Sequence, residues 1–274
     1  MLADFIRKIV PMRPRQEVAT WLAYAVARFR WLNIAFYYLL YGVVLKEEVK
    51  LLPNGNCEIA FRGSKITMPR DGIFAFIDVF RECVYDQFSS PREGDIVIDV
   101  GAHVGMYTIK AAKLVGDKGL VVAIEPDPNN LVLLQRNIEN YNLSNVKIVG
   151  KAAYNRTTKT RLFLSRSRAC NSLHYPHKNY IEVEADTLDN IVSELELDRV
   201  DFIKIDAEGS EPEVLEGSKK ILSFPGIKLS IACYHDLTNR ESELSSILSY
   251  LTSLGLQTKV YKKLYVYAIN APNT

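Results

Sequence analysis

The sequence has few cysteines and no excess of either charge. Its 274 residues include four cysteines, Cys57, Cys83, Cys170 and Cys233, and no two of them form a CxxC pair. This spacing disfavours a zinc knuckle or a dithiol redox site, and free thiols in a reducing compartment are the simplest interpretation. Lys and Arg number 34 against 32 Asp and Glu, a net charge of +2. Such a balance argues against a dedicated nucleic-acid-binding protein, whose affinity rests on a strongly basic surface.

A hydrophobic run long enough to cross a membrane is also missing. The uncharged stretch at residues 31–45 is shorter than the about 20 residues that a bilayer span needs. It lies too far from the first residue for an ordinary signal peptide. Three interpretations stay open for it: a helical pair packed on the main domain, a helix on a membrane surface, or a true span. We expect a cytoplasmic protein, with peripheral membrane contact through residues 18–45 as the alternative.

The composition is that of a folded protein with a large core. Hydrophobic residues make up 48% of the chain and charged residues 24%, which argues against disorder. A chain of this length buries enough surface to fold without disulfides or a metal. We expect two parts: a helical N-terminal appendage with a short β-hairpin over residues 1–70, and a main domain over residues 71–274.

Apolar strands alternate with amphipathic helices from residue 95 onward. This alternation predicts right-handed βαβ units and a parallel sheet. Two capping boxes, beginning at Ser210 and Thr238, each predict the start of a helix. The predicted strands are 95–100, 120–125, 145–149, 160–165, 181–184, 200–205 and 227–233, with a terminal antiparallel hairpin over 257–269. The predicted helices include 73–85, 106–115, 129–141 and 189–195.

The strongest chemical signal is the turn after the first of these strands. The strand ends in Asp99, and Gly101 and Gly105 follow before a helix begins. Glycines allow a tight turn, and a helix N-terminus attracts a negative group. A dinucleotide site prefers G-x-G-x-x-G, but His103 stands in place of its second glycine, which favours a carboxylate over a pyrophosphate. Glu125 ends the next strand, where an acid can accept hydrogen bonds from ribose hydroxyls.

A second polar cluster follows the strand over 200–205. Asp206 and Glu208 come directly after it, at the sheet edge that also carries Asp99. Lys204 lies inside the strand, where a lysine needs a carboxylate partner or a route to water. A strand end with a helix cap does not explain these residues together. The cluster therefore indicates a functional site.

Four segments together resemble one known family. Residues 98–108 (IDVGAHVGMYT), 124–130 (IEPDPNN), 183–192 (VEADTLDNIV) and 201–217 (DFIKIDAEGSEPEVLEG) are similar, in this order, to the FkbM family of S-adenosylmethionine-dependent methyltransferases. The resemblance implies an α/β fold, the Rossmann-like class I methyltransferase fold, with a seven-stranded, mostly parallel sheet and a C-terminal antiparallel hairpin. It also implies O-methylation of a hydroxyl on a sugar, glycan or small metabolite.

The resemblance assigns residues to the cofactor, S-adenosyl-L-methionine. Its methionine part would be held by Asp99, Gly101, Ala102 and Gly105. Its ribose would be bound by Glu125 and its adenine by Asn155. Asp206 would lie near the reacting methyl group.

Methyl transfer to a hydroxyl also needs a group that removes a proton. The candidates for catalysis are Asp206, Glu208 and His235, and an ordinary histidine pKa near 6.5 suits a base. A purely structural His235 is an equally open interpretation. We assign no metal site, although Asp206, Glu208 and Asp236 form an alternative set of Mg²⁺ ligands. His174 and His177 are expected in an exposed loop, with acceptor binding as the alternative.

Other functions stay open at this point. One is a nicotinamide-dependent oxidoreductase, which the glycine spacing disfavours. Another is a non-catalytic, membrane-associated protein that retains the fold. A nucleic-acid methyltransferase is the weakest option, because the sequence has neither an NPPY-like segment nor a basic excess. The expected partner is therefore a small-molecule or glycan acceptor.

Overall fold

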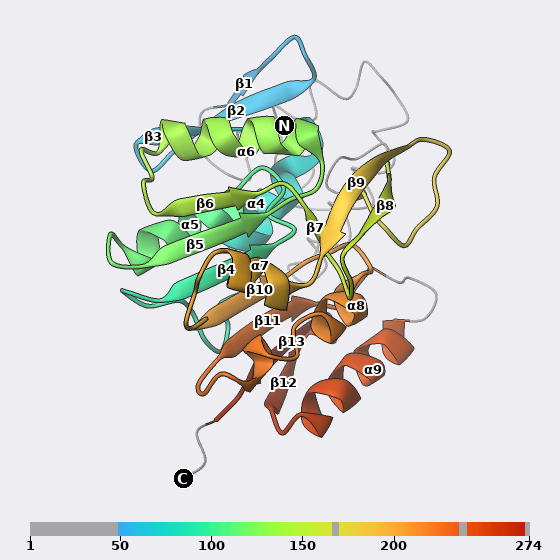
Figure 1. Cartoon of the computed structure of the whole chain (residues 1–274). Helices are drawn as coiled ribbons and strands as arrows, with labels where there is room; N and C mark the ends of the chain where they lie inside the picture. Colours follow the sequence, from blue (N-terminus) through green and yellow to red (C-terminus); the bar gives the residue numbers. More distant parts are fainter. Residues whose placement is uncertain (1–48, 166–169, 236–239, 272–274) are drawn as a thin grey trace, which may run out of the picture.

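The main domain is built on one seven-stranded sheet (Figure 1). The computed structural model describes residues 49–165, 170–235 and 240–271. The strand order is β12-β13-β11-β10-β4-β5-β6, with β11, β10, β4, β5 and β6 parallel and β12 and β13 antiparallel. The predicted sheet with a terminal hairpin is thus confirmed. The strands are β4 (Ile96–Val100), β5 (Leu120–Ile124), β6 (Val146–Val149), β10 (Phe202–Ile205), β11 (Lys228–Ala232), β12 (Gln257–Tyr261) and β13 (Tyr265–Ile269).

Alternate residues of the strands point to two separate cores. Val97, Val121 and Phe202 face one core with α4 and α5, whereas Ile98 and Val122 face the other with α7, α8 and α9. Both faces of the sheet are covered, as a parallel sheet requires. The helices are α4 (Ile73–Phe80), α5 (Met106–Val115), α6 (Pro128–Asn140), α7 (Leu188–Glu194), α8 (Glu211–Glu216) and α9 (Arg240–Ser253).

A small three-stranded sheet precedes the main domain. The predicted hairpin corresponds to β2 and β3, and a further strand, β1, pairs with β2. Asn137 ties this sheet to α6, because its side chain exchanges hydrogen bonds of 2.7 Å with the backbone N–H and C=O of Thr67. The strands are β1 (Val49–Leu51), β2 (Asn56–Phe61) and β3 (Ser64–Pro69).

Residues 1–48 of the predicted appendage lie outside the described residues. The same holds for the membrane contact predicted through residues 18–45, and the domain boundary after residue 70 stays a prediction. None of the described helices is long and apolar enough to cross a bilayer.

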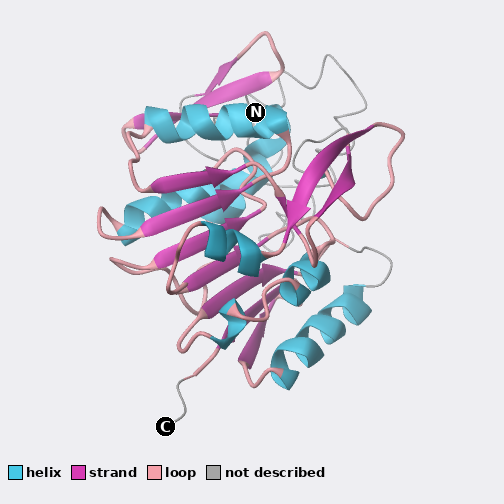
Figure 2. Cartoon of the chain, in the orientation of Figure 1, coloured by secondary structure: helices cyan, strands magenta, loops and turns pink. Residues whose placement is uncertain are grey.

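A third sheet lies beside the main one (Figure 2). Its order is β7-β9-β8, and β8 and β9 pair antiparallel over six residues. The segment that connects β8 to β9 contacts the turns that follow β5 and β10, as described below. The strands are β7 (Ala152–Ala153), β8 (Thr158–Phe163) and β9 (Tyr180–Asp186).

The first predicted helix of the main domain is shorter than its hydrophobic pattern. It ends at Phe80 rather than near Tyr85, because Cys83 adopts a left-handed backbone with φ of 50° and breaks the helix. The chain then crosses to the sheet edge. There the Tyr85 hydroxyl donates a hydrogen bond of 2.6 Å to Asp206.

Candidate active site at the carboxyl edge of the sheet

Four parallel strands bring the predicted site residues to one edge. β4 ends beside Asp99, β5 before Glu125, β10 before Asp206, and β11 shortly before His235. Open α/β sheets bind ligands outside these strand ends. The topology therefore places the two sequence motifs side by side.

The glycines of the β4–α5 turn are required by neighbouring protein atoms. A Cβ on Gly101 would lie 1.9 Å from the backbone oxygen of Asp206, and one on Gly105 would lie 2.5 Å from a Leu134 methyl group. Gly101 and Ala102 also donate backbone hydrogen bonds of 3.0 Å to Ile124. The turn is thus fastened between the ends of β5 and β10. Both glycines have positive φ, 69° and 88°, which glycine adopts without strain.

Asp99 is fully buried beneath this turn. Its Oδ1 lies 3.1 Å from the Lys204 ammonium, and its Oδ2 accepts a hydrogen bond of 2.6 Å from Thr108. Lys204 also donates to the backbone oxygens of Val100 and Gly101, at 3.1 and 2.9 Å. The lysine thus has the carboxylate partner that its position in the strand requires. Through Lys204, Asp99 holds the ends of β4 and β10 together.

Glu125 is the acid expected at the ribose. Its Oε2 accepts from the backbone N–H of His103 at 2.8 Å, and its Oε1 accepts from Asp127 N–H and the Asn130 amide at 3.0 and 3.2 Å. Burial raises the pKa of Glu125 to about 7, although the hydrogen bonds from Asp127, Asn130 and His103 favour the ionised form. The buried Oδ1 of Asn130 has no hydrogen-bond partner among the described residues. An unpaired acceptor beside this acid suits a ligand that brings hydroxyl donors.

Asn155, the residue predicted near the adenine, contacts helix α8. Its amide donates a hydrogen bond of 2.9 Å to Glu216 at the end of α8. A Cβ on the adjacent Gly217 would lie 2.1 Å from the Tyr154 backbone oxygen, so the two segments touch. The structure therefore joins Asn155 to α8, and its predicted place at the adenine stays a prediction.

The β10–α8 turn gathers three carboxylates around one imidazole. His235 Nε2 lies 3.1 Å from Asp206 and 3.5 Å from Glu208, and its Nδ1 lies 3.1 Å from Glu211. The His235 side chain is only 3% exposed, whereas Asp206 and Glu208 are 19% and 22% exposed. All three predicted catalytic residues are thus in contact, and the two acids face solvent.

His235, Asp206 and Glu208 differ in the direction in which their surroundings shift their pKa values. Burial alone would lower the pKa of His235, but the carboxylates of Glu211 and Glu208 outweigh it and raise that pKa well above its usual value. Burial would raise the pKa of Asp206, but Lys204 and His235 hold it well below its usual range. Burial raises the pKa of Glu208 to about 8. At neutral pH the imidazole is therefore a cation and Glu208 is close to its titration point.

Glu211 was not among the predicted site residues. It is fully buried and accepts hydrogen bonds from the backbone N–H groups of Ala207 and Gly209, at 2.7 and 3.0 Å. The helix start predicted at Ser210 is confirmed, since α8 begins at Glu211, but the Ser210 side chain makes no capping hydrogen bond. The acid after it closes the turn instead. The only sequence signal for this was an acidic residue in the first turn of a helix.

The connection between β8 and β9 crosses both motifs. Asn171 donates to Asp127 at 2.7 Å, and Ser172 donates to the backbone oxygen of Glu208 at 2.6 Å. His174 and His177 are both exposed, in agreement with the predicted loop. The segment around Ser172 therefore links the Glu125 side of the edge to the Glu208 side.

The structure describes two of the three residues considered as alternative Mg²⁺ ligands, Asp206 and Glu208. Asp236 lies outside the described residues. Asp206, Glu211 and His235 each offer a polar atom within 4.8 Å of the others. His235 lies between Asp206 and Glu211, at 3.1 Å from each, and its ring nitrogens are not the oxygen ligands that Mg²⁺ prefers. We therefore assign no metal to the cluster.

The residues at this edge fit S-adenosylmethionine on charge. Within the described part of the chain, the ion pairs of Asp99, Asp206, Glu208 and Glu211 join these four acids to two cationic groups, Lys204 and His235. The surplus of negative charge complements a sulfonium and an ammonium group. Glu125 with the unpaired Asn130 oxygen provides acceptors for a ribose. These acceptors thus suit the charged methionine part and the ribose of this cofactor.

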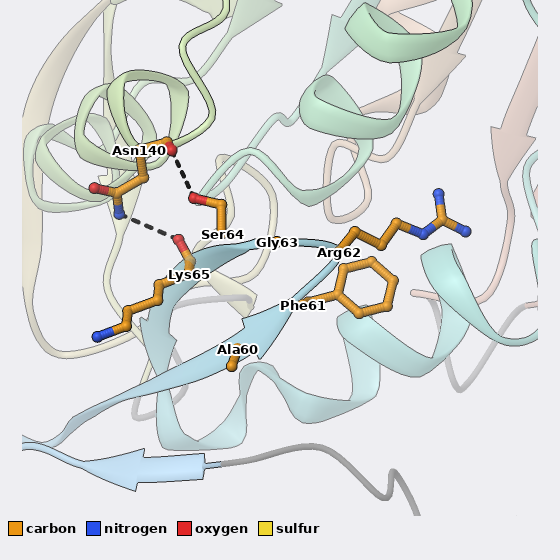
Figure 3. A pocket seen from close by; sticks show the side chains of 7 residues that line it. All are labelled: Ala60, Phe61, Arg62, Gly63, Ser64, Lys65 and Asn140. Carbon is orange, nitrogen blue, oxygen red and sulfur yellow. Dashed lines mark hydrogen bonds between the residues drawn. The ribbon is translucent and has the colours of Figure 1, made fainter.

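A separate hollow lies on the β2–β3 hairpin (Figure 3). It has a volume of about 520 Å³ and includes the basic residues Arg62 and Lys65. Ser64 and Asn140 already satisfy backbone atoms across it, at 2.5 and 3.1 Å. The hollow shares no residue with the carboxyl edge of the sheet.

Comparison with known proteins gives a family for this arrangement. The protein-family model described as "Methyltransferase FkbM domain" matches residues 99–258 of the sequence, which is more than half of the chain. A solved FkbM methyltransferase from Methylobacillus flagellatus has a similar fold, with 24% sequence identity and a TM-score of 0.50. That match covers 69% of this chain and 46% of the other.

Two curated relatives match over shorter lengths. Methyltransferase 1 of Beauveria bassiana is 23% identical over 168 residues, which cover 53% of this chain and 66% of the relative. A probable cobalt-precorrin-6B C(15)-methyltransferase of Sulfolobus acidocaldarius is 40% identical over 52 residues, covering 19% and 27%. The chain thus spans less than two thirds of the length of each of these proteins.

Proposed function

The chain belongs to the FkbM family of methyltransferases, and from this premise we propose that it transfers a methyl group to a hydroxyl of a sugar, glycan or small metabolite. Its cofactor is S-adenosylmethionine, which supplies an electrophilic methyl group when bound. The observation that carries the proposal is the partly exposed Glu208 carboxyl, held beside Asp206 and His235 in a turn rich in negative charge. The near-neutral net charge supports a small acceptor over a nucleic acid.

Glu208 is the best of the three candidates for the base. His235 is already protonated and faces Glu211 through one ring nitrogen and Asp206 through the other. Asp206, with its lowered pKa, is a weak proton acceptor. Glu208 combines exposure with a pKa of about 8, which suits proton transfer near neutral pH. It therefore takes the proton of the acceptor hydroxyl, while His235 and Asp206 hold the turn and its charge.

The first test measures cofactor binding and transfer. Isothermal titration with S-adenosylhomocysteine should give a single site, and Glu125→Ala should weaken it at least tenfold, because ribose hydroxyls lose a bidentate acceptor. Glu139→Ala removes an exposed acid of α6 and should leave the affinity unchanged. Radiolabelled cofactor incubated with glycan, lipid and small-metabolite fractions should label a pool. Binding of NAD(H) in place of S-adenosylhomocysteine would favour the oxidoreductase instead.

The pH dependence of the reaction should follow Glu208. Its charged neighbours are Asp206 and Glu211 on its own turn, Lys204 on β10 and His235 after β11. Because its pKa is raised to about 8, Glu208 is protonated below that pH and cannot accept a proton. We expect kcat/KM, which reports the free enzyme, to rise about tenfold per pH unit below pH 8 and to level off above it. A flat profile between pH 6 and 9 would assign the base elsewhere.

A further inference from the structure

The turn between β10 and α8 holds Glu208 in a conformation that glutamate rarely adopts. Glu208 and Gly209 both have positive φ, 52° and 98°, and only the glycine adopts such angles without strain. Within the turn, the Glu211 carboxylate accepts hydrogen bonds from the backbone N–H groups on either side of Glu208, those of Ala207 and Gly209. A strained residue persists only where its surroundings hold it. The contacts of the Glu208 backbone therefore decide where its carboxyl group lies.

Ser172 makes such a contact from the connection between β8 and β9. It is 1% exposed, and its hydroxyl donates a hydrogen bond of 2.6 Å to the backbone oxygen of Glu208. The hydroxyl oxygen accepts from the backbone N–H groups of His174 and Tyr175, at 2.9 and 3.2 Å. A serine hydroxyl has one proton and two lone pairs, so these three hydrogen bonds use its full capacity. The proton of Ser172 is thus directed at Glu208.

Elements outside the catalytic turn set the position of Ser172. Its backbone N–H and C=O pair with Phe163 at the end of β8, at 3.1 and 2.8 Å. Beside it, the Asn171 amide donates a hydrogen bond of 2.7 Å to Asp127. Asp127 caps the start of α6, and its backbone N–H donates at 3.0 Å to Glu125, the acid expected at the ribose. The hydroxyl is therefore anchored to the third sheet and to the cofactor side of the site.

Tyr175, three residues further on, covers the same turn. A Cβ on Gly209 would lie 2.7 Å from a carbon of the Tyr175 ring, so the ring packs directly on the buried glycine. A bulky side chain at this place keeps water from the backbone next to Glu208. Residues 172–175 thus both fasten the turn and limit its contact with solvent.

We propose that Ser172 is a positioning residue for Glu208: its hydroxyl holds the turn so that the Glu208 carboxyl lies beside His235. The inference rests on the proposed function, because it takes Glu208 as the base. The carboxyl lies 3.5 Å from His235 Nε2, and a rotation of the Glu208 backbone would carry it away. A base must lie within hydrogen-bond reach of the proton that it removes. A misplaced carboxyl therefore slows methyl transfer and leaves the affinity for the cofactor nearly unchanged.

Carbon-13 NMR of the full chain, with label in the glutamate carboxyl groups, tests this position without an acceptor. The Glu208 signal is the one that is missing from Glu208→Gln. Because neither serine nor alanine carries a charge, a changed titration of Glu208 in Ser172→Ala reports a moved carboxyl. The charged and titratable groups around Glu208 stay the same in both proteins; they are Asp206, Glu211, Lys204, His235 and, packed on the turn, Tyr175.

We expect the titration midpoint of Glu208 to fall by at least one pH unit in Ser172→Ala. Burial is the largest cause of the raised pKa of Glu208, and a released carboxyl regains water. Transfer of labelled methyl should fall at least tenfold, while S-adenosylhomocysteine binds within about threefold of the parent. Ser172→Thr keeps the hydroxyl and should keep the parent's midpoint. Ser193→Ala changes an exposed serine of α7 and is the matched control.

Two outcomes would overturn the inference. One is a Glu208 midpoint that Ser172→Ala leaves unchanged, and the other is a Ser172→Thr midpoint that moves as far as that of Ser172→Ala. Where thermal melts show that Ser172→Ala does not fold, Asn171→Ala takes its place, because it removes the anchor at Asp127 and keeps the hydroxyl. Its midpoint should also fall, and an unchanged one contradicts the inference. Failure of the proposed function looks different: S-adenosylhomocysteine would not bind the parent, or Glu208→Gln would transfer methyl at the full rate.

Discussion

Glu208→Gln should lower kcat by about 10²–10⁴-fold, the contribution typical of a positioned general base. The substitution keeps the shape of the side chain and removes its ability to take a proton. Glu208 has a left-handed backbone, with φ of 52°. The Ser172 hydroxyl holds it in place by donating a hydrogen bond of 2.6 Å to its backbone oxygen, which the substitution keeps. The backbone of the turn should therefore be unchanged. Single-turnover transfer of labelled methyl at pH 8 measures the effect.

The control separates the base from its surroundings. Glu213→Gln changes another acid of the same segment, in the first turn of α8, and should keep at least half of the activity. S-adenosylhomocysteine should bind Glu208→Gln within about threefold of the parent, since the other carboxylates of the turn remain. A variant that keeps full kcat would exclude Glu208 as the base. His235 would then have to lose its proton, which a kcat that rises only well above pH 8 would reveal.

The order of elements could be predicted from the sequence because the main sheet follows a strong pattern. The helix over Met106–Val115 and the strand over Gln257–Tyr261 have the predicted bounds, since glycines and a hairpin turn delimit them. The helix from Ile73 could not be placed as well. Its apolar pattern continues to Tyr85, but the aromatic residue packs on the sheet after a left-handed Cys83. Periodicity reports which residues are buried, and it does not report which element buries them.

The sequence predicts that several residues of the candidate site lie close together, but it does not predict their charge states. The strand ends placed Asp99, Glu125 and Asp206 at one edge, because parallel strands end together. An ordinary pKa suggested His235 as a base, but the three carboxylates around it come from a turn far away in sequence. The contact of Glu211 with His235 could not be predicted for the same reason. Tertiary contacts decide charge, and local sequence does not contain them.

Lys204 is where fold and site depend on each other most. Its side chain is 4% exposed, and its ammonium group lies 3.1 Å from Asp99 and 4.0 Å from Asp206. Burial would lower the pKa of Lys204, but the carboxylates of Asp99 and Asp206 raise it, so the group stays charged. It also donates to the backbone of the β4–α5 turn. Removing this cation leaves a fully buried Asp99 without its counter-charge, and breaking a buried pair in this way is strongly unfavourable.

We therefore expect Lys204→Met to lower the free energy of unfolding by about 3–5 kcal/mol, which corresponds to a fall in Tm of roughly 10 °C. Chemical denaturation and thermal melts measure both quantities. The double variant Lys204→Met/Asp99→Asn removes the isolated charge as well and should recover at least half of the loss, because the two residues are coupled. Exposed Lys118→Met, whose partner Glu93 is also exposed, should change stability by less than about 1 kcal/mol. If Lys204→Met melts like the parent, then the Lys204–Asp99 pair does not stabilise the fold, and backbone hydrogen bonds alone hold β4 against β10.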